Sequence, residues 1–393
     1  MRDAADRSGA VTIGIVAGEA SGDALAATLI ATVRARLPHA RFVGVAGPKM
    51  EAAGCEVWHP LETLSVAGLT EVLARLPEIV ALRRDVARRM VAEKVALFIG
   101  VDAPDFNLGL ERKLKRRGLR TMHLVSPAVW AWRRGRVAAI GRAVHRILVL
   151  FPFEPPIYEA KGIPVTFVGH PLAQEAATLG SRREARDQLK LGVAQPVFAL
   201  LPGSRTVEVE RHGELLLETA AALHAARPDA RFLVPLATRS TRDQFEAASY
   251  RTGHDKLPMT LLYGHSTDAL RAADVAIVAS GTATLEAALA RCPHVIFYRL
   301  SAVTAGIVRR KILIPWVGLP NVLAGRYVVP ELLQEDATVE NLMQAALNLY
   351  DDTVTRRRLE ALFAGFADAL RADTGTIAAD AVAAELRAAG AMA

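Results

Sequence analysis

Two polar segments in the first half of the chain carry residues that could move a proton. Asp102 comes directly after the apolar run 95–101, where a strand of a parallel sheet would end. A carboxylate held there can accept a proton from a bound hydroxyl, so Asp102 is the best candidate for a general base. Glu19 and Ser21 lie in the segment 18–23, which follows the first apolar run. A capped turn would explain its glycines and Ser21, but it leaves Glu19 unexplained.

Two segments in the second half combine groups that suit a diphosphate. LPGSR (201–205) offers backbone N–H groups, the hydroxyl of Ser204 and the guanidinium of Arg205, although a surface turn with a solvated arginine is the simpler alternative. ASGTATLE (279–286) runs from an apolar run into the start of an expected helix. Its small residues would let phosphate oxygens approach the helix N-terminus, whose partial positive charge stabilises an anion. These residues are Ser280, Gly281, Thr282 and Ala283.

Glu286 lies about one turn into that helix, one position too far for a capping box. It is therefore predicted to accept hydrogen bonds from ribose hydroxyls. A weaker signal comes from Asn321 and from Glu331 and Gln334, which are predicted to share one face of a helix. Such groups suit sugar hydroxyls, and an ordinary capped helix explains them equally well. None of these segments matches the dinucleotide pattern GxGxxG or the P-loop pattern GxxxxGK[ST].

Apolar runs of strand length alternate with helix-length segments twice along the chain, which is typical of parallel βα units. The polar segments described above follow such runs, so they would lie at the carboxyl ends of strands, where open parallel sheets bind ligands. We therefore predict two doubly wound α/β domains. The expected strands are 11–17, 41–46, 95–101, 120–125, 145–150 and 165–168 in the first half, and 197–201, 231–235, 260–263, 275–279 and 294–298 in the second.

The expected division is an N-terminal domain over 11–170, a linker over 171–190, a C-terminal domain over 191–365 and a helical tail over 366–393. The alanine-rich part of the tail is too weakly apolar to be stable as an isolated helix, so it should pack on another element.

Length and composition agree with this division. A chain of 393 residues with 51% hydrophobic and 23% charged residues is typical of a globular protein of two domains and excludes disordered and fibrous classes. The net charge of +7 favours anionic partners. Cys55 and Cys292 are too few for a disulfide framework or a CxxC metal site, which favours a reducing cytoplasm. No apolar run approaches the length of a membrane-spanning helix.

Two further segments could contact large partners. The stretch 112–146 contains many Lys and Arg residues and no acid, interleaved with Trp130 and Trp132, which suits single-stranded nucleic acid or anionic lipid headgroups. The stretch 61–82 is either a core-facing amphipathic helix or an interfacial segment that dips into a bilayer. Its large apolar residues include Val66, Leu69, Val72, Leu73 and Leu76.

Taken in order, a series of segments resembles the lipid A disaccharide synthase family, the membrane-associated glycosyltransferases of Gram-negative lipid A assembly. They are AGEASGD (17–23), GVDAPDFN (100–107), HLVSPAVWAWRRGRV (123–137), FPFE (151–154), FVGHPL (167–172), LLPGSR (200–205), ASGTATLEAAL (279–289) and LPNVLAGRYVVPELLQ (319–334). The resemblance spans both expected domains. SGTATLE alone would indicate only a two-domain nucleotide-sugar enzyme.

The resemblance implies two facing Rossmann-like domains of the GT-B type with an interdomain cleft. The acceptor side comes first, the donor side second, and the final helix returns to the first domain. It implies a hexosyltransferase that joins UDP-2,3-diacylglucosamine to the 6-hydroxyl of 2,3-diacylglucosamine 1-phosphate, giving the β-1,6-linked disaccharide 1-phosphate and UDP. The donor bond is α and the product bond β, so one displacement with one base suffices.

The resemblance also assigns roles. Asp102 is the base, and Glu19 is its orienter or a second candidate. UDP is stabilised as it leaves by Ser204, Arg205 and the helix start 280–283, while Glu286 holds the ribose. Asn321, Glu331 and Gln334 address the donor sugar. The acceptor and its acyl chains are assigned to Ser21, Val66, Leu69, Val72, Leu73 and Leu76. There is no DxD motif, so neither a metal nor another cofactor is expected.

Both substrates implied by the resemblance carry acyl chains, which favours a cytoplasmic protein bound peripherally to anionic lipids on the inner face of the inner membrane. No nucleic acid is expected as a partner, and a homodimer is compatible with the sequence. An enzyme similar to UDP-sugar 2-epimerases could share the fold and the ribose contact of Glu286, but it would have no use for an exposed apolar segment. Binding to liposomes would distinguish the glycosyltransferase from the epimerase. A protein that binds nucleic acid would instead have to give a salt-sensitive gel shift.

Overall fold

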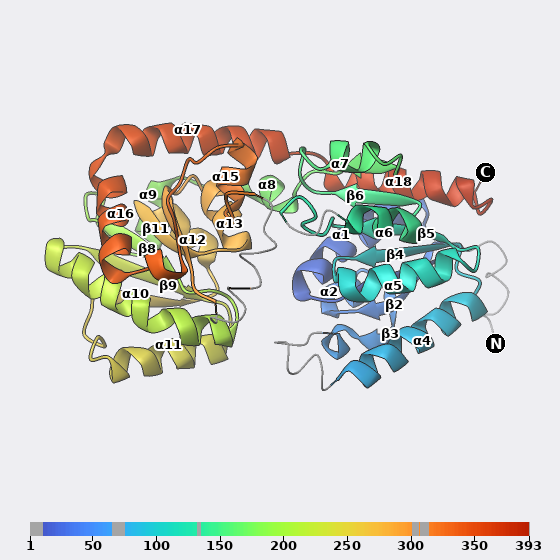
Figure 1. Ribbon diagram of the computed structural model, residues 1–393, viewed down its shortest axis with the longest axis horizontal. Helices are drawn as coiled ribbons and strands as arrows, with labels where there is room; N and C mark the ends of the chain where they lie inside the picture. The colour runs from blue at the N-terminus through green and yellow to red at the C-terminus, as the bar shows by residue number, and fades with distance from the viewer. Residues whose placement is uncertain (1–10, 65–74, 132–134, 301–305, 307–313, 393) are drawn as a thin grey trace. The chain divides into compact units, whose positions relative to one another are not determined.

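The computed structural model describes residues 11–64, 75–131, 135–300, 306 and 314–392. The chain divides into two compact units. Unit 1 comprises Met1–Pro171 and Leu370–Ala393, and unit 2 comprises Leu172–Ala369. Each unit is built on one parallel sheet with helices packed on both faces (Figure 1). The predicted fold class of two Rossmann-like α/β domains is therefore confirmed.

The sheet of unit 1 has the strand order β3-β2-β1-β4-β5-β6-β7. Its strands are β1 (Thr12–Ala17), β2 (Arg41–Ala46), β3 (Cys55–Pro60), β4 (Leu97–Val101), β5 (Arg120–Leu124), β6 (Arg146–Val149) and β7 (Val165–Phe167). Its helices are α1 (Ala20–Arg36), α2 (Pro48–Ala52), η1 (Leu61–Thr63), α4 (Leu76–Ala92), α5 (Pro104–Lys115), α6 (Arg136–Ala143), α7 (Pro155–Glu159) and α18 (Thr374–Ala388).

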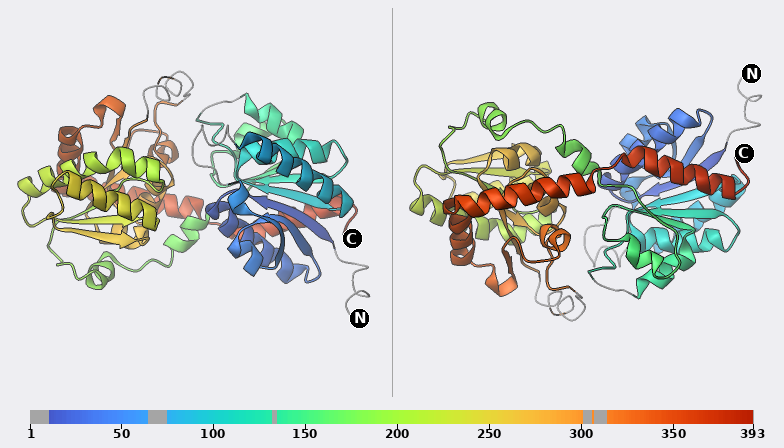
Figure 2. Two further views of the ribbon diagram at one scale, coloured as in Figure 1. Left: turned by 90° about the horizontal axis from the view of Figure 1, so that it is seen from below. Right: turned by 90° about the horizontal axis from the view of Figure 1, so that it is seen from above.

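Helix α18 joins unit 1 from the far end of the chain and packs along α1 (Figure 2). Its small apolar residues share one core cluster with α1 and the central strands, while α4 and α5 cover the other face of the sheet. Glu385 on α18 is 3% exposed and forms ion pairs with Arg120 and Arg146 on β5 and β6. The weakly apolar tail is thus held by packing and by a buried carboxylate.

The sheet of unit 2 has the strand order β10-β9-β8-β11-β12-β13. Its strands are β8 (Val197–Leu201), β9 (Arg231–Leu236), β10 (Met259–Tyr263), β11 (Val275–Ala279), β12 (His294–Tyr298) and β13 (Glu331–Leu333). Its helices are α8 (Pro171–Ala176), α9 (Arg182–Gln188), α10 (Thr206–Ala226), α11 (Arg239–Arg251), α12 (Ser266–Ala272), α13 (Thr282–Leu289), α15 (Leu319–Ala324), η2 (Gln334–Asp336), α16 (Val339–Asp351) and α17 (Thr353–Leu370).

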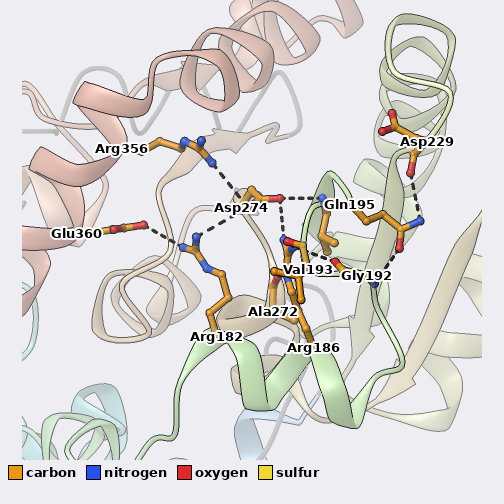
Figure 3. A network of polar contacts seen from close by, with 11 residues as sticks. Arg182, Arg186, Gly192, Val193, Gln195, Asp229, Ala272, Asp274, Arg356 and Glu360 are labelled. Carbon is orange, nitrogen blue, oxygen red and sulfur yellow. Dashed lines mark hydrogen bonds and ion pairs between the residues drawn. The ribbon is translucent and has the colours of Figure 1, made fainter.

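The segment predicted as a linker, 171–190, instead contains α8 and α9, and α9 packs against α12. Arg186 on α9 is 4% exposed and donates hydrogen bonds to Asp274 and to the carbonyl oxygens of Ala272, Gly192 and Val193 (Figure 3). Arg186 therefore joins α9 to unit 2 through a buried hydrogen bond to Ala272 and an ion pair with Asp274.

The apolar stretch 61–82 is only partly described. Val66, Leu69, Val72 and Leu73 lie outside the described residues. Of the flanking residues, Ile79 and Leu82 pack against the core beside α5, whereas Leu76 is 47% exposed. Among the described residues, no helix is both long and apolar enough to cross a bilayer.

The basic stretch 112–146 uses several of its charges inside unit 1. Arg120 and Arg146 pair with Glu385, and the ammonium of Lys115 donates to the carbonyl oxygens of Gly141 and Val144. Trp132 lies outside the described residues. The described part of the stretch is therefore spread over several elements, as expected for a segment that contains a buried strand.

Candidate functional site

The candidate ligand site of unit 2 lies where the strand order changes direction. β8 and β11 are neighbours at the centre of the sheet, and their connections lead to opposite sides. Such a switch point leaves a crevice at the carboxyl ends of the two strands. The structure has a pocket of about 540 Å³ there, lined by residues that follow both strands.

The pocket brings together most of the residues that the sequence predicted for UDP. Those that line it are Ser204, Arg205, Ser280, Gly281, Thr282, Ala283 and Glu286. The sequence analysis missed Glu208, Ser266 and Tyr298, which also line it and come from three further elements.

Helix α13 presents its N-terminus to this pocket. Gly281 is its N-cap residue and has φ +153°, a conformation that favours glycine. No side chain caps the helix, and its first N–H groups have no acceptor within the helix. A Cβ atom at Gly281 would meet no atom within 4 Å, so the space in front of the helix is open. This geometry suits phosphate oxygens.

The loop 202–205 is held by Glu208 of α10. Its Oε2 accepts hydrogen bonds from the N–H groups of Ser204 and Arg205, at 2.9 and 3.2 Å. Its Oε1 accepts one from the Tyr298 hydroxyl at 2.9 Å. The expectation that the Ser204 and Arg205 amides are available to phosphate is therefore wrong, because a carboxylate already uses them. The exposed guanidinium of Arg205 and the Ser204 hydroxyl are the groups that this loop presents.

The opposite side of this loop is held by His212. Its Nδ1 donates to the Pro202 carbonyl oxygen at 2.8 Å, and its Nε2 accepts the Arg299 N–H at 3.2 Å. Burial lowers the pKa of His212, which agrees with a neutral ring that donates through one nitrogen and accepts through the other. The loop is therefore fixed before any ligand arrives.

Glu286 lines the pocket from α13. Burial raises the pKa of its carboxyl, and the charge of Glu175 adds to this effect. Ser266, the first residue of α12, donates a hydrogen bond to Glu286 Oε2 at 3.0 Å. Ser266 thereby orients the carboxylate and leaves Oε1 for other donors. No sequence signal pointed to Ser266, because the fold alone brings α12 beside α13.

The structure differs from the prediction for Glu331 and Gln334. Glu331 lies on β13 and Gln334 begins η2 with φ +53°, so the expected shared helical face does not exist. Glu331 accepts hydrogen bonds from the N–H groups of Val317 and Gly318. β13 has only three residues, which are too few to show the alternating pattern of a strand. The spacing of Glu331 and Gln334 therefore resembles that of a helix.

Asn321 is fully buried, and its amide makes its full complement of hydrogen bonds. It donates to the Val329 carbonyl and to Glu331, and it accepts from the N–H groups of Val328 and Val329. Such a side chain has no polar atom left for a sugar. The predicted direct contact of Asn321 with the donor sugar therefore does not fit its geometry.

In unit 1, the loops that carry Glu19 and Asp102 lie side by side. β1 pairs with β4, with Ala17 opposite Val101, so the next residues of both strands emerge together. A Cβ atom at Gly18 would lie 2.4 Å from the Cβ of Ala103. A glycine is therefore required for this approach of the two loops.

Asp102 is held in an uncommon backbone conformation. Asp102 and Ala103 have φ +51° and +42°, although neither is a glycine. The N–H of Asp102 donates to the Leu124 carbonyl at 2.8 Å, and its carbonyl accepts from Asn107 Nδ2 at 2.9 Å. Residues held in such conformations cluster at functional sites. The side chain of Asp102 is half-buried.

Glu19 and Ser21 are exposed at the start of α1. Glu19 is the N-cap residue, with no side-chain capping bond. Asp23 is buried and accepts hydrogen bonds from the amides of residues 47, 49 and 50 at the start of α2. Asp23 is thus structural, while Glu19 remains at the surface of the loop beside Asp102. Among the described residues, no group of three or more His, Cys, Asp or Glu side chains could hold a metal ion.

Glu154, in the segment FPFE, is a buried carboxyl. Because of it, we expect the free energy of unfolding to depend on pH. Burial raises its pKa to about 7, although Phe151 donates an N–H to Oε2 at 3.0 Å. At a pH between the ordinary pKa of a glutamate and about 7, the folded state therefore keeps a proton that the unfolded chain has lost. The free energy of unfolding falls as the pH rises through about 7. The total decrease in the free energy of unfolding is about 3 kcal/mol.

Glu154→Gln cannot ionise and still accepts the Phe151 N–H. Its unfolding midpoint, relative to that of the unchanged protein, should therefore rise between about pH 5 and pH 8. Thermal unfolding followed by circular dichroism at both pH values measures this difference. A difference that is the same at both values would contradict the assignment.

The chain is similar over nearly its whole length to proteins of one family. A family model described as lipid-A-disaccharide synthetase matches residues 13–382. The lipid-A-disaccharide synthase of Chromobacterium violaceum is 52% identical over 376 residues, which cover 96% of this chain and 97% of that protein.

Two solved structures are similar in fold only. A glycosyltransferase from Rickettsia africae has a TM-score of 0.56 at 9% identity, covering 97% of this chain and 99% of that one. The UDP-GlcNAc 2-epimerase from Neisseria meningitidis, bound to UDP-GlcNAc, has a TM-score of 0.59 at 10% identity, covering 96% of this chain and 99% of that one. Both likenesses extend over both units.

Proposed function

This chain belongs to the lipid-A-disaccharide synthase family of glycosyltransferases, and from that premise we propose that it transfers 2,3-diacylglucosamine from UDP to the 6-hydroxyl of 2,3-diacylglucosamine 1-phosphate. The observation that carries the proposal is the pocket of unit 2, where the residues predicted for UDP meet at a topological switch point. An epimerase is a weaker candidate, because its likeness to the chain is distant and confined to the fold.

The donor half of the reaction follows from the pocket. The diphosphate lies against the N-terminus of α13, where the partial positive charge of the helix and the Arg205 guanidinium stabilise the charge that develops on departing UDP. The ribose hydroxyls donate to Glu286, which Ser266 orients. Glu331 acts on the donor indirectly, by holding the backbone of residues 317 and 318.

The acceptor half needs one base. Asp102 takes the proton of the acceptor 6-hydroxyl while that oxygen attacks the anomeric carbon, and the bond from that carbon to UDP breaks on the opposite side. The product is therefore β-linked. Glu19, in the adjacent loop, orients the acceptor or serves as the alternative base.

Incubation of the pure protein with the two lipid substrates tests the function. UDP and a disaccharide 1-phosphate should form in equal amounts, and they should still form in excess EDTA, since the helix N-terminus and Arg205 serve the diphosphate. Conversion of UDP-GlcNAc to its 2-epimer, without disaccharide, would support the epimerase instead.

We also propose peripheral binding to the inner face of the inner membrane through the stretch 61–82. Replacing Val66, Leu69 and Leu73 with Ser should weaken binding to anionic liposomes, because each side chain that enters lipid contributes roughly 1 to 2 kcal/mol. Liposome co-sedimentation and the thermal midpoint are measured together. A variant that unfolds would show that these side chains belong to the core.

A further inference from the structure

Asn107 on α5 contacts the ends of the two strands from which the loops of Glu19 and Asp102 begin. Its side chain is fully buried. Its Nδ2 donates to the carbonyl oxygens of Asp102 at 2.9 Å, of Val16 on β1 at 3.3 Å and of Val101 on β4 at 3.4 Å. One amide therefore joins the carboxyl ends of both strands.

The orientation of this amide follows from its partners. All three are carbonyl oxygens, which only accept hydrogen bonds, so the NH₂ group of Asn107 has to face them. Its Oδ1 is buried and has no hydrogen-bond partner among the described residues. A buried acceptor without a partner costs stability. Packing alone therefore does not account for an amide at this position, whereas the hydrogen bonds of its nitrogen do.

Asn107 also holds the uncommon backbone conformation of the Asp102 loop. Asp102 and Ala103 both have positive φ, which disfavours residues with a Cβ atom. The side chain of Asn107 binds the carbonyl of Asp102, and its backbone N–H donates to the carbonyl of Ala103 at 3.0 Å. The backbone conformation determines where the Cβ of Asp102 points. The contacts that hold this turn therefore also set the direction of the carboxylate.

Two glycines leave room for this arrangement. A Cβ atom at Gly100 on β4 would lie 2.8 Å from the Cβ of Asn107 and 3.0 Å from its Cγ. A larger residue there would push the amide away from the strand ends. On the other side of the turn, Gly18 allows the loop of Glu19 to approach Ala103. The helix and the adjacent loop thus both close on the same two residues.

We propose that Asn107 is a positioning residue for the transfer reaction. It holds the turn 102–103 in its left-handed conformation and fixes it to the end of β1, so that the Asp102 carboxylate meets the acceptor hydroxyl in a constant direction. This inference rests on the proposed function, in which Asp102 is the base. Because Asn107 is fully buried, it acts through Asp102, and its loss should affect the chemical step more than binding.

The test is a double-mutant cycle of Asn107→Ala and Asp102→Asn, with kcat, the KM of the acceptor and the affinity for UDP measured for each variant. Asn107→Ala alone should lower kcat by about 10-fold to 100-fold and change KM and UDP affinity by less than about twofold. In the Asp102→Asn background, the same substitution should lower kcat by less than about threefold, because the base that Asn107 positions is already absent.

A rescue variant and a matched control separate positioning from general stability. Glycine adopts positive φ at little cost, so Ala103→Gly should restore part of the kcat that Asn107→Ala loses. The control is Thr121→Val. Thr121 is also fully buried, and its hydroxyl donates to the Ala143 carbonyl at 2.9 Å, near the start of β5 and thus at the opposite end of the sheet. It should lower the thermal midpoint and leave kcat unchanged.

Losses that multiply in the cycle, no restoration by Ala103→Gly, or an equal loss of kcat in Thr121→Val would each overturn the proposal. If Asn107→Ala is unfolded at the assay temperature, Asn107→Ser replaces it in the cycle. Its hydroxyl can bond to the Ala103 carbonyl one turn earlier on the helix, but it is too short to join the two strands. Failure of the proposed function is recognised separately, because Asp102→Asn alone would then retain its turnover.

Discussion

Asp102→Asn should lower turnover by about 10²-fold to 10⁴-fold, because the amide cannot take the proton of the acceptor hydroxyl. Affinity for UDP should be nearly unchanged, since the pocket that we assign to UDP is formed entirely by unit 2 residues. Steady-state kinetics with both lipid substrates and calorimetric titration with UDP measure the two quantities.

Asp105→Asn is the matched control. Asp105 lies three residues further on, its side chain is 83% exposed, and it pairs with Arg136. The control should therefore keep near-normal turnover. Near-normal turnover of Asp102→Asn as well, combined with a large loss in Glu19→Gln, would transfer the role of base to Glu19.

Glu286→Ala should weaken UDP binding by about 1 to 3 kcal/mol, the usual cost of losing hydrogen bonds to a charged acceptor. This corresponds to roughly 5-fold to 150-fold in Kd. The thermal midpoint should barely change, because the loss of the hydrogen bond from Ser266 is offset by the removal of a carboxylate whose pKa is raised by burial. Calorimetric titration with UDP gives the affinity.

Glu340→Ala serves as the control, because Glu340 is an exposed glutamate in the first turn of α16, away from the pocket. Its affinity for UDP should equal that of the unchanged protein. If Glu286→Ala loses stability and affinity in parallel, Glu286 is a structural residue and the ribose contact belongs to another side chain.

Most of the sheet architecture could be predicted from the sequence, because central parallel strands are buried on both faces and appear as unbroken apolar runs. β4 and β11 are fully buried and were found in this way. β3 was missed: it lies at the edge of its sheet, most of its side chains are half-buried or exposed, and it ends in proline. β13 is an edge strand of three residues, too short to show a period.

The candidate site divides in the same way. Site residues in the loops that follow strands could be predicted, since they come directly after apolar runs in the sequence. Glu208 could also have been predicted, because it lies three residues after Arg205, the spacing of the acid in a capping box. Ser266 left none, because only the packing of α12 beside α13 brings it to Glu286.

The attachment of α18 to unit 1 determines the order in which the chain can complete its folding. Unit 2 is continuous in sequence, whereas unit 1 is assembled from both sides of it. During synthesis, β5 and β6 leave the ribosome long before Glu385 does. The ion pairs of Arg120 and Arg146 with Glu385, and the packing of α18 on α1, can therefore form only after α18 has been translated. Every segment of unit 2 is therefore translated before the helix that completes unit 1. A stop codon shortly after residue 370 would remove α18 and with it part of the core of unit 1.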